Sequence, residues 1–333
     1  MRAVVLREYG GREVLRIEEV ADPVPSAGEV LIRVRAAGVN RADVLQRMGR
    51  YPPPGPPPEL DIPGLEVAGV VEAVGSRVSG VRPGDRVMCL LANGGYAERV
   101  VVPAEMLMPI PEEMGFDWGA AIPEAFLTAF DALVNRGRLK PGDRVLVHAA
   151  ASGVGSAAVQ LAHAMGARQV FGTTRTPWKA ERLRELFPWL RMIVAGDELF
   201  TDVVAHETEG YGVDVVVDFI GASYLAMNLE CLASRGRIVC VATLGGARGE
   251  INIRHLMSKR ALIEGTVLRA RPLHEKVALT KEFLHQVMPW LEEGRVFPLI
   301  HQVLPLEKVT EAHRLLEENL TLGKVVLALT RDA

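Results

Sequence analysis

Cysteine, aromatic residues and net charge are all scarce in this chain, and each scarcity excludes a class of protein. The 333 residues include 3 cysteines, an odd and scattered set, so no disulfide framework is expected. Aromatic residues make up 5% of the chain and its formal net charge is −3, which gives no basic surface for a nucleic acid. We therefore expect neither a disulfide-rich nor a nucleic-acid-binding protein.

Long uninterrupted apolar runs are also missing, although 49% of the residues are hydrophobic. No run approaches the roughly 18 residues that a membrane-spanning helix needs, and the charged first residues do not fit a signal peptide. A chain of 333 residues is too long for one ordinary core. These features predict a cytoplasmic protein with two domains and no membrane partner.

Two kinds of secondary-structure pattern divide the chain. The first part is β-rich, with predicted strands at 2–7, 29–37, 67–74, 86–89 and 97–102. From about Trp118 helices alternate with strands, which are predicted at 144–149, 169–173, 192–195, 214–218, 237–242, 262–268 and 324–329. Continuous Val and Ile runs, as in 213–220, are typical of strands buried on both faces of a parallel sheet. The predicted class is α/β with a doubly wound parallel sheet.

One of these strands ends in a turn of small residues that opens a helix. The turn consists of Ser152, Gly153, Val154 and Gly155. Small side chains let the backbone approach a pyrophosphate, and the N–H groups and dipole of the following helix favour its charge. An ordinary turn between a strand and a helix is the alternative interpretation, but the strand before and the helix after favour a dinucleotide site.

The end of the next strand indicates which dinucleotide is bound. Folds that prefer NAD place an acidic residue there, whereas this chain has Arg175 and Lys179 and no acid before Glu181. A guanidinium and an ammonium suit a 2′-phosphate. The alternative is a solvated loop with incidental charges. The sequence therefore predicts NADPH as the cofactor.

The order of a β-rich part, a nucleotide fold and a C-terminal return resembles the medium-chain dehydrogenase/reductases. Segments at 38–43, 63–69 and 81–87 match that superfamily. The resemblance implies a GroES-like catalytic domain made of residues 1–122 and 268–333. It also implies a Rossmann NADPH-binding domain at 123–267.

The residues at the zinc-ligand positions of this superfamily differ in this chain. The zinc alcohol dehydrogenases have Cys and His at the positions of Asn40 and Arg41, His at Leu65, and a third ligand, Cys, near Glu124. A catalytic zinc needs three protein ligands. Asn40 and Leu65 cannot supply a thiolate and an imidazole, so we predict that the chain binds no metal.

The chain instead resembles the zinc-independent quinone oxidoreductases, the group that includes zeta-crystallin. Residues 40–43, 51–55, 120–129 and 148–155 carry this resemblance. It implies that Asn40 and Tyr51 line the active site, that Thr128 lies on the nicotinamide side and that Lys179 binds the 2′-phosphate. The chain departs from the family at three points, with Leu45 at a second active-site tyrosine, Ala195 or Gly196 at a cofactor tyrosine, and Asn319 at a cofactor arginine.

Asn40 and Tyr51 are the expected hydrogen-bond donors to a developing oxyanion, although a turn residue and a ring packed on prolines are the alternatives. Glu124 is either a proton source or an ordinary helix-start residue, and His148 is expected to be a core histidine. Asp43 and Glu66 are expected to be structural. The predicted cofactor set also includes Asn40, Tyr51, Thr174, Ile220, Gly221, Thr243, Leu268 and Asn319.

The predicted activity is reduction of a quinone by NADPH. Two alternatives stay open, a reductase of enones or 2-alkenals and a non-catalytic NADPH-binding protein. The apolar segment 262–268 would lie at the edge of the sheet, where an uncovered strand tends to pair with another chain. In the related superfamily this strand pairs with its two-fold mate, so we expect a homodimer or a tetramer.

Overall fold

The computed structural model describes residues 1–329, which fold into two compact units. The first unit joins Met1–Leu127 to the C-terminal segment that begins at Leu268, and the second is Thr128–Val267. The first boundary was expected at 122/123, whereas the structure places it inside helix α3 (Pro123–Phe130). No helix among residues 1–329 is long and apolar enough to cross a membrane.

The second unit, whose residues are all described, is built on a six-stranded parallel sheet, which confirms the predicted doubly wound class. Its strand order is β10-β9-β8-β11-β12-β13, so the order reverses between β8 and β11. In such sheets ligands bind beyond the carboxyl ends of the strands at the reversal. The strands are β8 (Arg144–Val147), β9 (Gln169–Thr174), β10 (Leu190–Val194), β11 (Val213–Asp218), β12 (Leu232–Cys240) and β13 (Leu262–Gly265).

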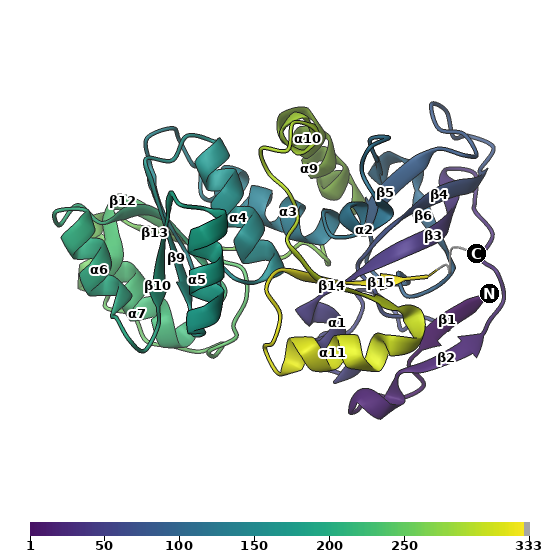
Figure 1. Cartoon of the computed structure of the whole chain (residues 1–333), viewed down its shortest axis with the longest axis horizontal. Helices are drawn as coiled ribbons and strands as arrows, with labels where there is room; N and C mark the ends of the chain where they lie inside the picture. Colours follow the sequence, from purple (N-terminus) through teal and green to yellow (C-terminus); the bar gives the residue numbers. More distant parts are fainter. Residues whose placement is uncertain (330–333) are drawn as a thin grey trace. The chain divides into compact units, whose positions relative to one another are not determined.

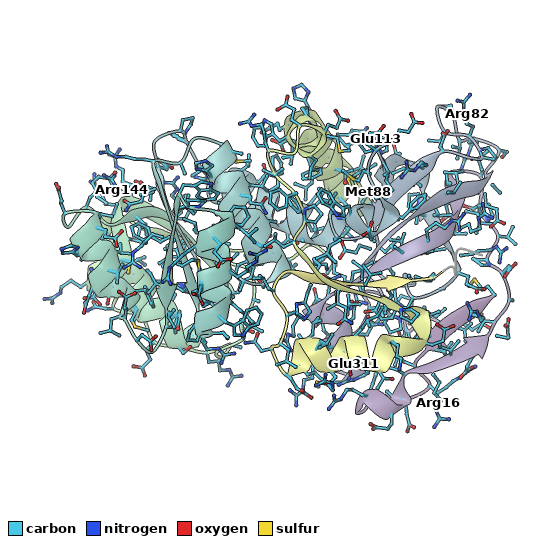
Figure 2. All side chains as sticks on the ribbon, viewed as in Figure 1. Arg16, Arg82, Met88, Glu113, Arg144 and Glu311 are labelled. Carbon is cyan, nitrogen blue, oxygen red and sulfur yellow. The ribbon has the colours of Figure 1, made fainter. Side chains whose placement is uncertain are left out.

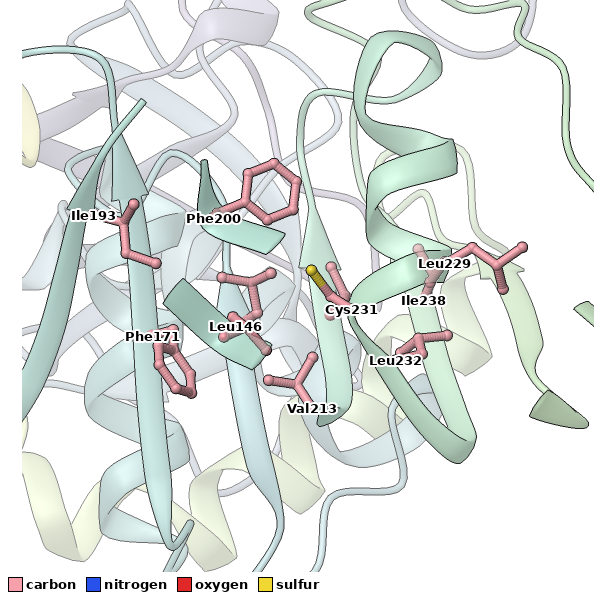
Figure 3. Packing of buried hydrophobic residues seen from close by; sticks show 11 residues of the cluster. Leu146, Phe171, Ile193, Phe200, Val213, Leu229, Cys231, Leu232 and Ile238 are labelled. Carbon is pink, nitrogen blue, oxygen red and sulfur yellow. The ribbon is translucent and has the colours of Figure 1, made fainter. Parts of the chain in front are cut away.

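Helices connect consecutive strands of this sheet and cover both of its faces. Figure 1 shows α4 and α5 on one side of the strands and α6 and α7 on the other. Buried side chains such as Leu146, Phe171 and Phe200 join the strands to these helices (Figure 3). Burying one such side chain contributes about 1.5–3 kcal/mol. The helices are α4 (Gly153–Ala164), α5 (Pro177–Leu186), α6 (Phe200–Glu207), α7 (Ala222–Cys231) and α8 (Ile253–Lys259).

The first unit is built on a mixed sheet with the order β14-β15-β3-β4-β5-β7, and β6 also pairs with β3. Met88 on β5 is buried, whereas Arg82 in the turn before that strand reaches solvent (Figure 2). β14 and β15 are parallel, and the other pairs are antiparallel. The strands are β3 (Glu29–Val39), β4 (Glu66–Val74), β5 (Arg86–Leu90), β6 (Arg99–Pro103), β7 (Leu107–Pro109), β14 (Ile300–Pro305) and β15 (Lys324–Ala328).

Three strands of this unit had not been predicted. β2 (Arg16–Glu19) pairs with β1 (Arg2–Val5), and β7 and β14 are the others. β7 is only three residues long, and β2 and β14 are mostly exposed or half-buried. Such strands give little of the apolar pattern on which the prediction depends.

A single residue, Asn40, separates the end of β3 from the start of helix α1 (Arg41–Arg47). It packs against α11 (Val309–Glu317) from the C-terminal segment (Figure 1). A proline-rich loop, residues 51–58, follows α1 and precedes β4. The remaining helices are α2 (Phe116–Gly119), α9 (Leu273–Gln286) and α10 (Met288–Glu292).

Candidate active site

The strand register of the first unit brings Lys324, Asn40 and Glu66 together. β15 and β4 both pair antiparallel with β3, so their first residues lie on either side of the chain that leaves β3 at Asn40. The Lys324 ammonium donates hydrogen bonds to Oδ1 of Asn40 and, at 2.5 Å, to Oε1 of Glu66. Nδ2 of Asn40 donates to the same Glu66 oxygen at 2.9 Å. All three side chains are buried, so a buried ion pair supports the amide.

These contacts limit what Asn40 can offer a ligand. Its Oδ1 is occupied by Lys324, and one Nδ2–H is occupied by Glu66. Its second N–H approaches the carbonyl oxygen of Gly38 at 3.4 Å, which is longer than a normal hydrogen bond. Only this weakly engaged N–H is left for a ligand. The donor role of Asn40 therefore stays a prediction.

Glu66 connects this cluster to helix α3. Its Oε2 accepts the backbone N–H of Glu124 at 2.8 Å, and the side chain is fully buried. A Cβ added at Gly38 would lie 2.3 Å from both Oε1 of Glu66 and the carbonyl oxygen of Ala120, so only glycine permits this packing. With both oxygens bonded and no exposure, Glu66 has the structural character that its sequence context suggested.

Glu124 has a different environment from Glu66. The residue is half-buried, and its Oε2 is buried without a hydrogen-bond partner among the described residues. Burial, and then the nearby charge of Glu66, raise the pKa of Glu124 to about 8. Its carboxyl group is therefore mainly protonated at neutral pH.

Asp43 holds the start of α1 in place. Its Oδ2 accepts the backbone N–H of Asn40 at 2.7 Å and the hydroxyl of Tyr96 at 2.9 Å. Burial raises the pKa of Asp43 to about 6 and lowers the pKa of His313, which lies 3.4 Å from the Tyr96 hydroxyl, to about 3. A fully buried network of this kind fixes the backbone of Asn40.

Arg269 holds the loop that carries Tyr51. This arginine is 3% exposed and follows Leu268, the first residue of the returning segment. It donates from Nη1 to the carbonyl oxygen of Tyr51 at 2.8 Å, from Nη2 to Oε1 of Gln46 at 2.6 Å, and from Nε to the carbonyl oxygen of Ala92 at 2.7 Å. Its guanidinium carbon lies 5.2 Å from the centre of the Tyr51 ring. The planar guanidinium of Arg269 therefore fixes both the backbone and the ring of Tyr51.

The hydroxyl of Tyr51 is suited to donate a hydrogen bond. Burial, and then the charge of Glu124, raise the pKa of Tyr51, so the phenol keeps its proton. The ammonium of Lys276 interacts electrostatically with Glu124 and Arg269, and burial lowers the pKa of Lys276. Tyr51, Glu124, Lys276 and Arg269 thus form one group of interacting polar side chains within the first unit.

In the second unit, the turn predicted to bind the pyrophosphate has the expected geometry. Oγ of Ser152 accepts the backbone N–H of Gly155 at 3.0 Å and caps α4. A Cβ at Gly155 would lie 2.2 Å from the carbonyl oxygen of Ala149, so the close approach of helix and strand requires glycine. Gly153 and Val154 complete the first turn of the helix. This N-terminus fits an anionic group such as a pyrophosphate.

Other predicted cofactor residues lie at the carboxyl ends of the same strands. Thr174 ends β9, Ile220 and Gly221 follow β11, and Thr243 follows β12. Oδ1 of Asp218 accepts the backbone N–H groups of Ile220 at 2.7 Å and Gly221 at 3.1 Å, which shapes the loop after β11. The parallel sheet therefore brings these residues to the edge at which such folds bind nucleotides.

The two predicted phosphate ligands differ in exposure. Arg175 is exposed, whereas Lys179 is 2% exposed with its Nζ 5.6 Å from the centre of the Trp178 ring. Thr128 is buried, and its Oγ1 has no hydrogen-bond partner among residues 1–329. An unpaired buried hydroxyl fits a site that receives a ligand group. Asn319 belongs to the first unit and lies exposed after α11.

The positions of the superfamily's zinc ligands hold a different chemistry here. Leu65 is a fully buried apolar residue, and Asn40 is bonded to an ammonium. In the part of the chain that the structure describes, no three His, Cys, Asp or Glu side chains are grouped to hold a metal ion. Independence from zinc stays a prediction.

Two important residues were missed by the sequence analysis, Lys324 and Arg269. Lys324 could have been found as a buried charge, because it is the first residue of an apolar strand whose residues are mostly buried. Arg269 directly follows Leu268, which was itself predicted, but nothing in the local sequence indicates its three partners. His148 is a satisfied core histidine, with Nδ1 3.0 Å from Thr173 Oγ1 and Nε2 2.6 Å from Asn228 Oδ1.

Comparisons with known proteins agree with both units. Residues 26–112 match the alcohol dehydrogenase GroES-like domain, and residues 192–327 match the family described as zinc-binding dehydrogenase. A quinone oxidoreductase from Lama guanicoe is 36% identical over 333 residues, which cover 99% of this chain and 98% of that protein. These matches confirm the predicted combination of a GroES-like domain and a Rossmann domain in one chain.

Solved structures give the same result. The chain resembles the crystal structure of an NAD-dependent alcohol dehydrogenase with a TM-score of 0.88 and 35% identity, over 99% of this chain and 100% of that one. It resembles the Escherichia coli quinone oxidoreductase complexed with NADPH with a TM-score of 0.87 and 29% identity, again over 99% and 100% of the two chains.

Proposed function

Since the chain belongs to the quinone oxidoreductase family of the medium-chain dehydrogenase/reductases, we propose that it reduces a quinone with NADPH and without zinc. The chain is an oxidoreductase with a nicotinamide cofactor and a small-molecule substrate. The observation that carries this proposal is the buried cluster of Lys324, Asn40 and Glu66. An ammonium ion, rather than thiolate and imidazole ligands, organises the positions that bind zinc in related enzymes.

A quinone suits such a site because its reduction needs no Lewis acid. The bound cofactor supplies a hydride, which carries two electrons, and the protein orients the acceptor and stabilises the charge that develops on oxygen. The Tyr51 hydroxyl is the principal donor in this proposal because Arg269 fixes its ring and backbone while the phenol stays protonated. Asn40 contributes the N–H that only Gly38 engages weakly.

The preference for NADPH rests on Arg175. Its exposed guanidinium follows β9, where the adenosine ribose lies in folds of this type, and no acidic residue precedes Glu181. The relatives point in both directions, because one similar structure is named as NAD-dependent and another was solved with NADPH. The buried Lys179 is the second proposed ligand.

We also propose that the protein forms a homodimer, or a tetramer of such dimers. β13 is the edge strand of the parallel sheet, and apolar side chains near it are exposed. Met257 is 70%, Val267 49% and Leu262 38% exposed. A second copy of the chain would cover this edge by pairing β13 with its mate. The cytoplasmic location stays a prediction.

A matrix of cofactors and acceptors tests the proposed function. Purified protein is given NADPH or NADH together with benzoquinones, naphthoquinones, enones or 2-alkenals, and both cofactor oxidation and the reduced product are measured. We expect the highest kcat/KM for NADPH with a quinone, and no change after exhaustive chelation. Faster reduction of an enone would support the alternative reductase. Tight NADPH binding without turnover of any acceptor would support a non-catalytic binding protein.

A further inference from the structure

Reduction of a quinone leaves one proton to be supplied. A quinone that accepts a hydride gains two electrons and one proton, and the resulting hydroquinone anion needs a second proton to become the neutral hydroquinone. If the proposed function holds, a group of the protein must hold this second proton. Such a group must keep a proton at neutral pH, lie among the substrate-binding residues and exchange with solvent.

Glu124 is the carboxyl group that meets these three conditions. Its Oε2 is buried without a hydrogen-bond partner in the described part of the chain, while the residue as a whole is half-buried. One oxygen of the carboxyl group is thus enclosed by protein, while the residue as a whole is partly exposed to solvent. Its backbone N–H is fixed on Glu66 Oε2 at 2.8 Å, so the side chain starts from a rigid position.

The surrounding charges explain why the proton is retained. Burial is the main cause, and the carboxylates of Glu66 and Asp43 add to it. Lys324 and Arg269 act in the opposite sense, but Lys324 is already paired with Glu66 at 2.5 Å and Arg269 is bonded to Tyr51, Gln46 and Ala92. Both cations therefore have other partners, and a charge on Glu124 would be poorly compensated.

Neighbouring groups are less suited to the task. Asp43 is fully buried, with Oδ2 bonded to the Asn40 N–H and the Tyr96 hydroxyl, so it has no exchange with solvent. The phenol of Tyr51 holds its proton more tightly than an ordinary tyrosine. Lys276 donates from Nζ to the carbonyl oxygen of Arg269 at 2.7 Å, which occupies that ammonium.

We propose that Glu124 is a carboxylic acid in the resting protein and donates the proton that completes quinone reduction. The O–H bond of Glu124 breaks and a new O–H bond forms on the hydroquinone oxygen, while the two electrons come with the hydride of NADPH. Glu124 is left as a carboxylate, and a proton from solvent restores the acid. Tyr51 then stabilises the oxyanion, and Glu124 neutralises it.

The first test observes the carboxyl group directly in the cofactor-free protein. Infrared spectra recorded across a pH titration report the C=O band of a protonated carboxylic acid. We expect wild-type protein to show such a band that disappears on titration through about pH 8, and Glu124→Gln to lack it. Glu113→Gln is the matched control, because Glu113 is exposed in the same unit (Figure 2), and it should keep the band. A spectrum of Glu124→Gln identical to wild type overturns the proposal.

The second test follows the proton in turnover. We expect Glu124→Gln to lower kcat for quinone reduction about 10–100-fold. This loss is smaller than the full rate contribution of a general acid, because water replaces Glu124 in part as the proton donor. The decline of kcat/KM at alkaline pH should vanish in Glu124→Gln, and Glu124→Asp should restore part of the rate. NADPH affinity and the folded fraction at the assay pH should match those of Glu113→Gln.

The outcomes separate the two proposals. Quinone turnover with an unchanged rate and pH profile in Glu124→Gln overturns the role of Glu124 and leaves the quinone reductase intact. A rate that falls only in proportion to the folded fraction of Glu124→Gln also overturns the role of Glu124 and leaves the quinone reductase intact. Wild-type protein that reduces no quinone overturns the proposed function, and the proton-donor role with it.

Discussion

Nη1 of Arg269 donates a hydrogen bond to the carbonyl oxygen of Tyr51 at 2.8 Å across 218 residues of sequence. The same guanidinium lies over the Tyr51 ring, 5.2 Å from its centre. The loop that carries Tyr51 is therefore held by the first residues of the C-terminal segment. Arg269 directly follows the boundary between the two units along the chain.

Replacing Arg269 by lysine should loosen this loop. Lysine keeps the charge but not the planar fork that reaches Tyr51, Gln46 and Ala92 at once. We expect the free energy of unfolding to fall by about 1–3 kcal/mol and KM for the quinone to rise. Urea denaturation and steady-state kinetics measure the two effects. Arg16→Lys, at an exposed position, is the control and should change neither quantity. Unchanged stability and KM in Arg269→Lys would contradict the role of Arg269 in holding Tyr51.

Removing only the hydroxyl of Tyr51 should separate catalysis from folding. Tyr51→Phe keeps the ring and the carbonyl oxygen on which Arg269 acts, so the melting temperature should not change. The loss of one oxyanion donor should lower kcat/KM. The corresponding loss of transition-state stabilisation is about 2–4 kcal/mol at most, and less where a water molecule replaces the hydroxyl. Tyr9→Phe, at an exposed site, is the control. Full turnover in Tyr51→Phe would show that the tyrosine is structural.

Asn40 should behave differently because its amide is part of the buried cluster. Asn40→Ala leaves the Lys324 ammonium and the Glu66 carboxylate each with one partner fewer. We expect a loss of about 1–3 kcal/mol in the free energy of unfolding, together with a lower kcat. If kcat falls only in step with the folded fraction, Asn40 supports the fold and donates nothing to the substrate.

The two proposed phosphate ligands should be separable by their effects on stability. Arg175 is exposed, so Arg175→Ala should weaken NADPH binding by about 1.5–3 kcal/mol and leave NADH binding and the melting temperature unchanged. Lys179 is buried, so Lys179→Ala should lower the melting temperature as well. Isothermal titration with both cofactors gives the affinities. Equal losses for NADH and NADPH would contradict recognition of a 2′-phosphate.

The fold was largely predictable because its signals are local. Strands of a parallel sheet are buried on both faces, so continuous runs such as that of β11 identify them, and the turn at residues 152–155 follows from small residues. Asn40 and Tyr51 came from the resemblance, since nothing in their local sequence distinguishes them from a turn residue and a packed ring.

The polar contacts of the site were not predictable from the sequence. Lys324 meets Glu66 across 258 residues, and that pairing depends on the register of two strands on β3. The burial of Lys179 depends on how α5 packs against β9 and β10, which a charge pattern does not specify. The register of strands far apart in the sequence and the rotation of a helix on a sheet are tertiary properties. Local sequence patterns do not specify them.

Charges placed on the exposed edge of the parallel sheet should disrupt the proposed dimer. Leu262→Lys combined with Val267→Lys puts like charges on both copies of the edge, which opposes pairing. We expect wild-type protein to sediment as a dimer or larger species and the double variant as a monomer. Leu199→Lys, exposed after the opposite edge strand β10, is the control. A monomeric wild type, or a double variant that stays dimeric, would contradict this interface.

The pH dependence of stability should report the state of Glu124 without any cofactor. Its pKa is about 8 in the folded protein and near the ordinary 4.5 when unfolded, so between these values the folded state binds the extra proton. The free energy of unfolding contributed by this group is therefore fully present below about pH 4.5 and is lost as the pH rises through 8. Glu124→Gln removes this slope.

Relative to wild type, Glu124→Gln should therefore become more stable as the pH rises. One pKa unit corresponds to about 1.4 kcal/mol, and partial exposure of the side chain reduces the full effect, so we expect a relative gain of roughly 2–4 kcal/mol between pH 5 and pH 9. Asp43 titrates in both proteins, so the comparison removes most of its contribution. Urea denaturation at a series of pH values measures the difference, and Glu113→Gln should run parallel to wild type. A constant difference between Glu124→Gln and wild type would mean that Glu124 is ionised in the folded protein at neutral pH.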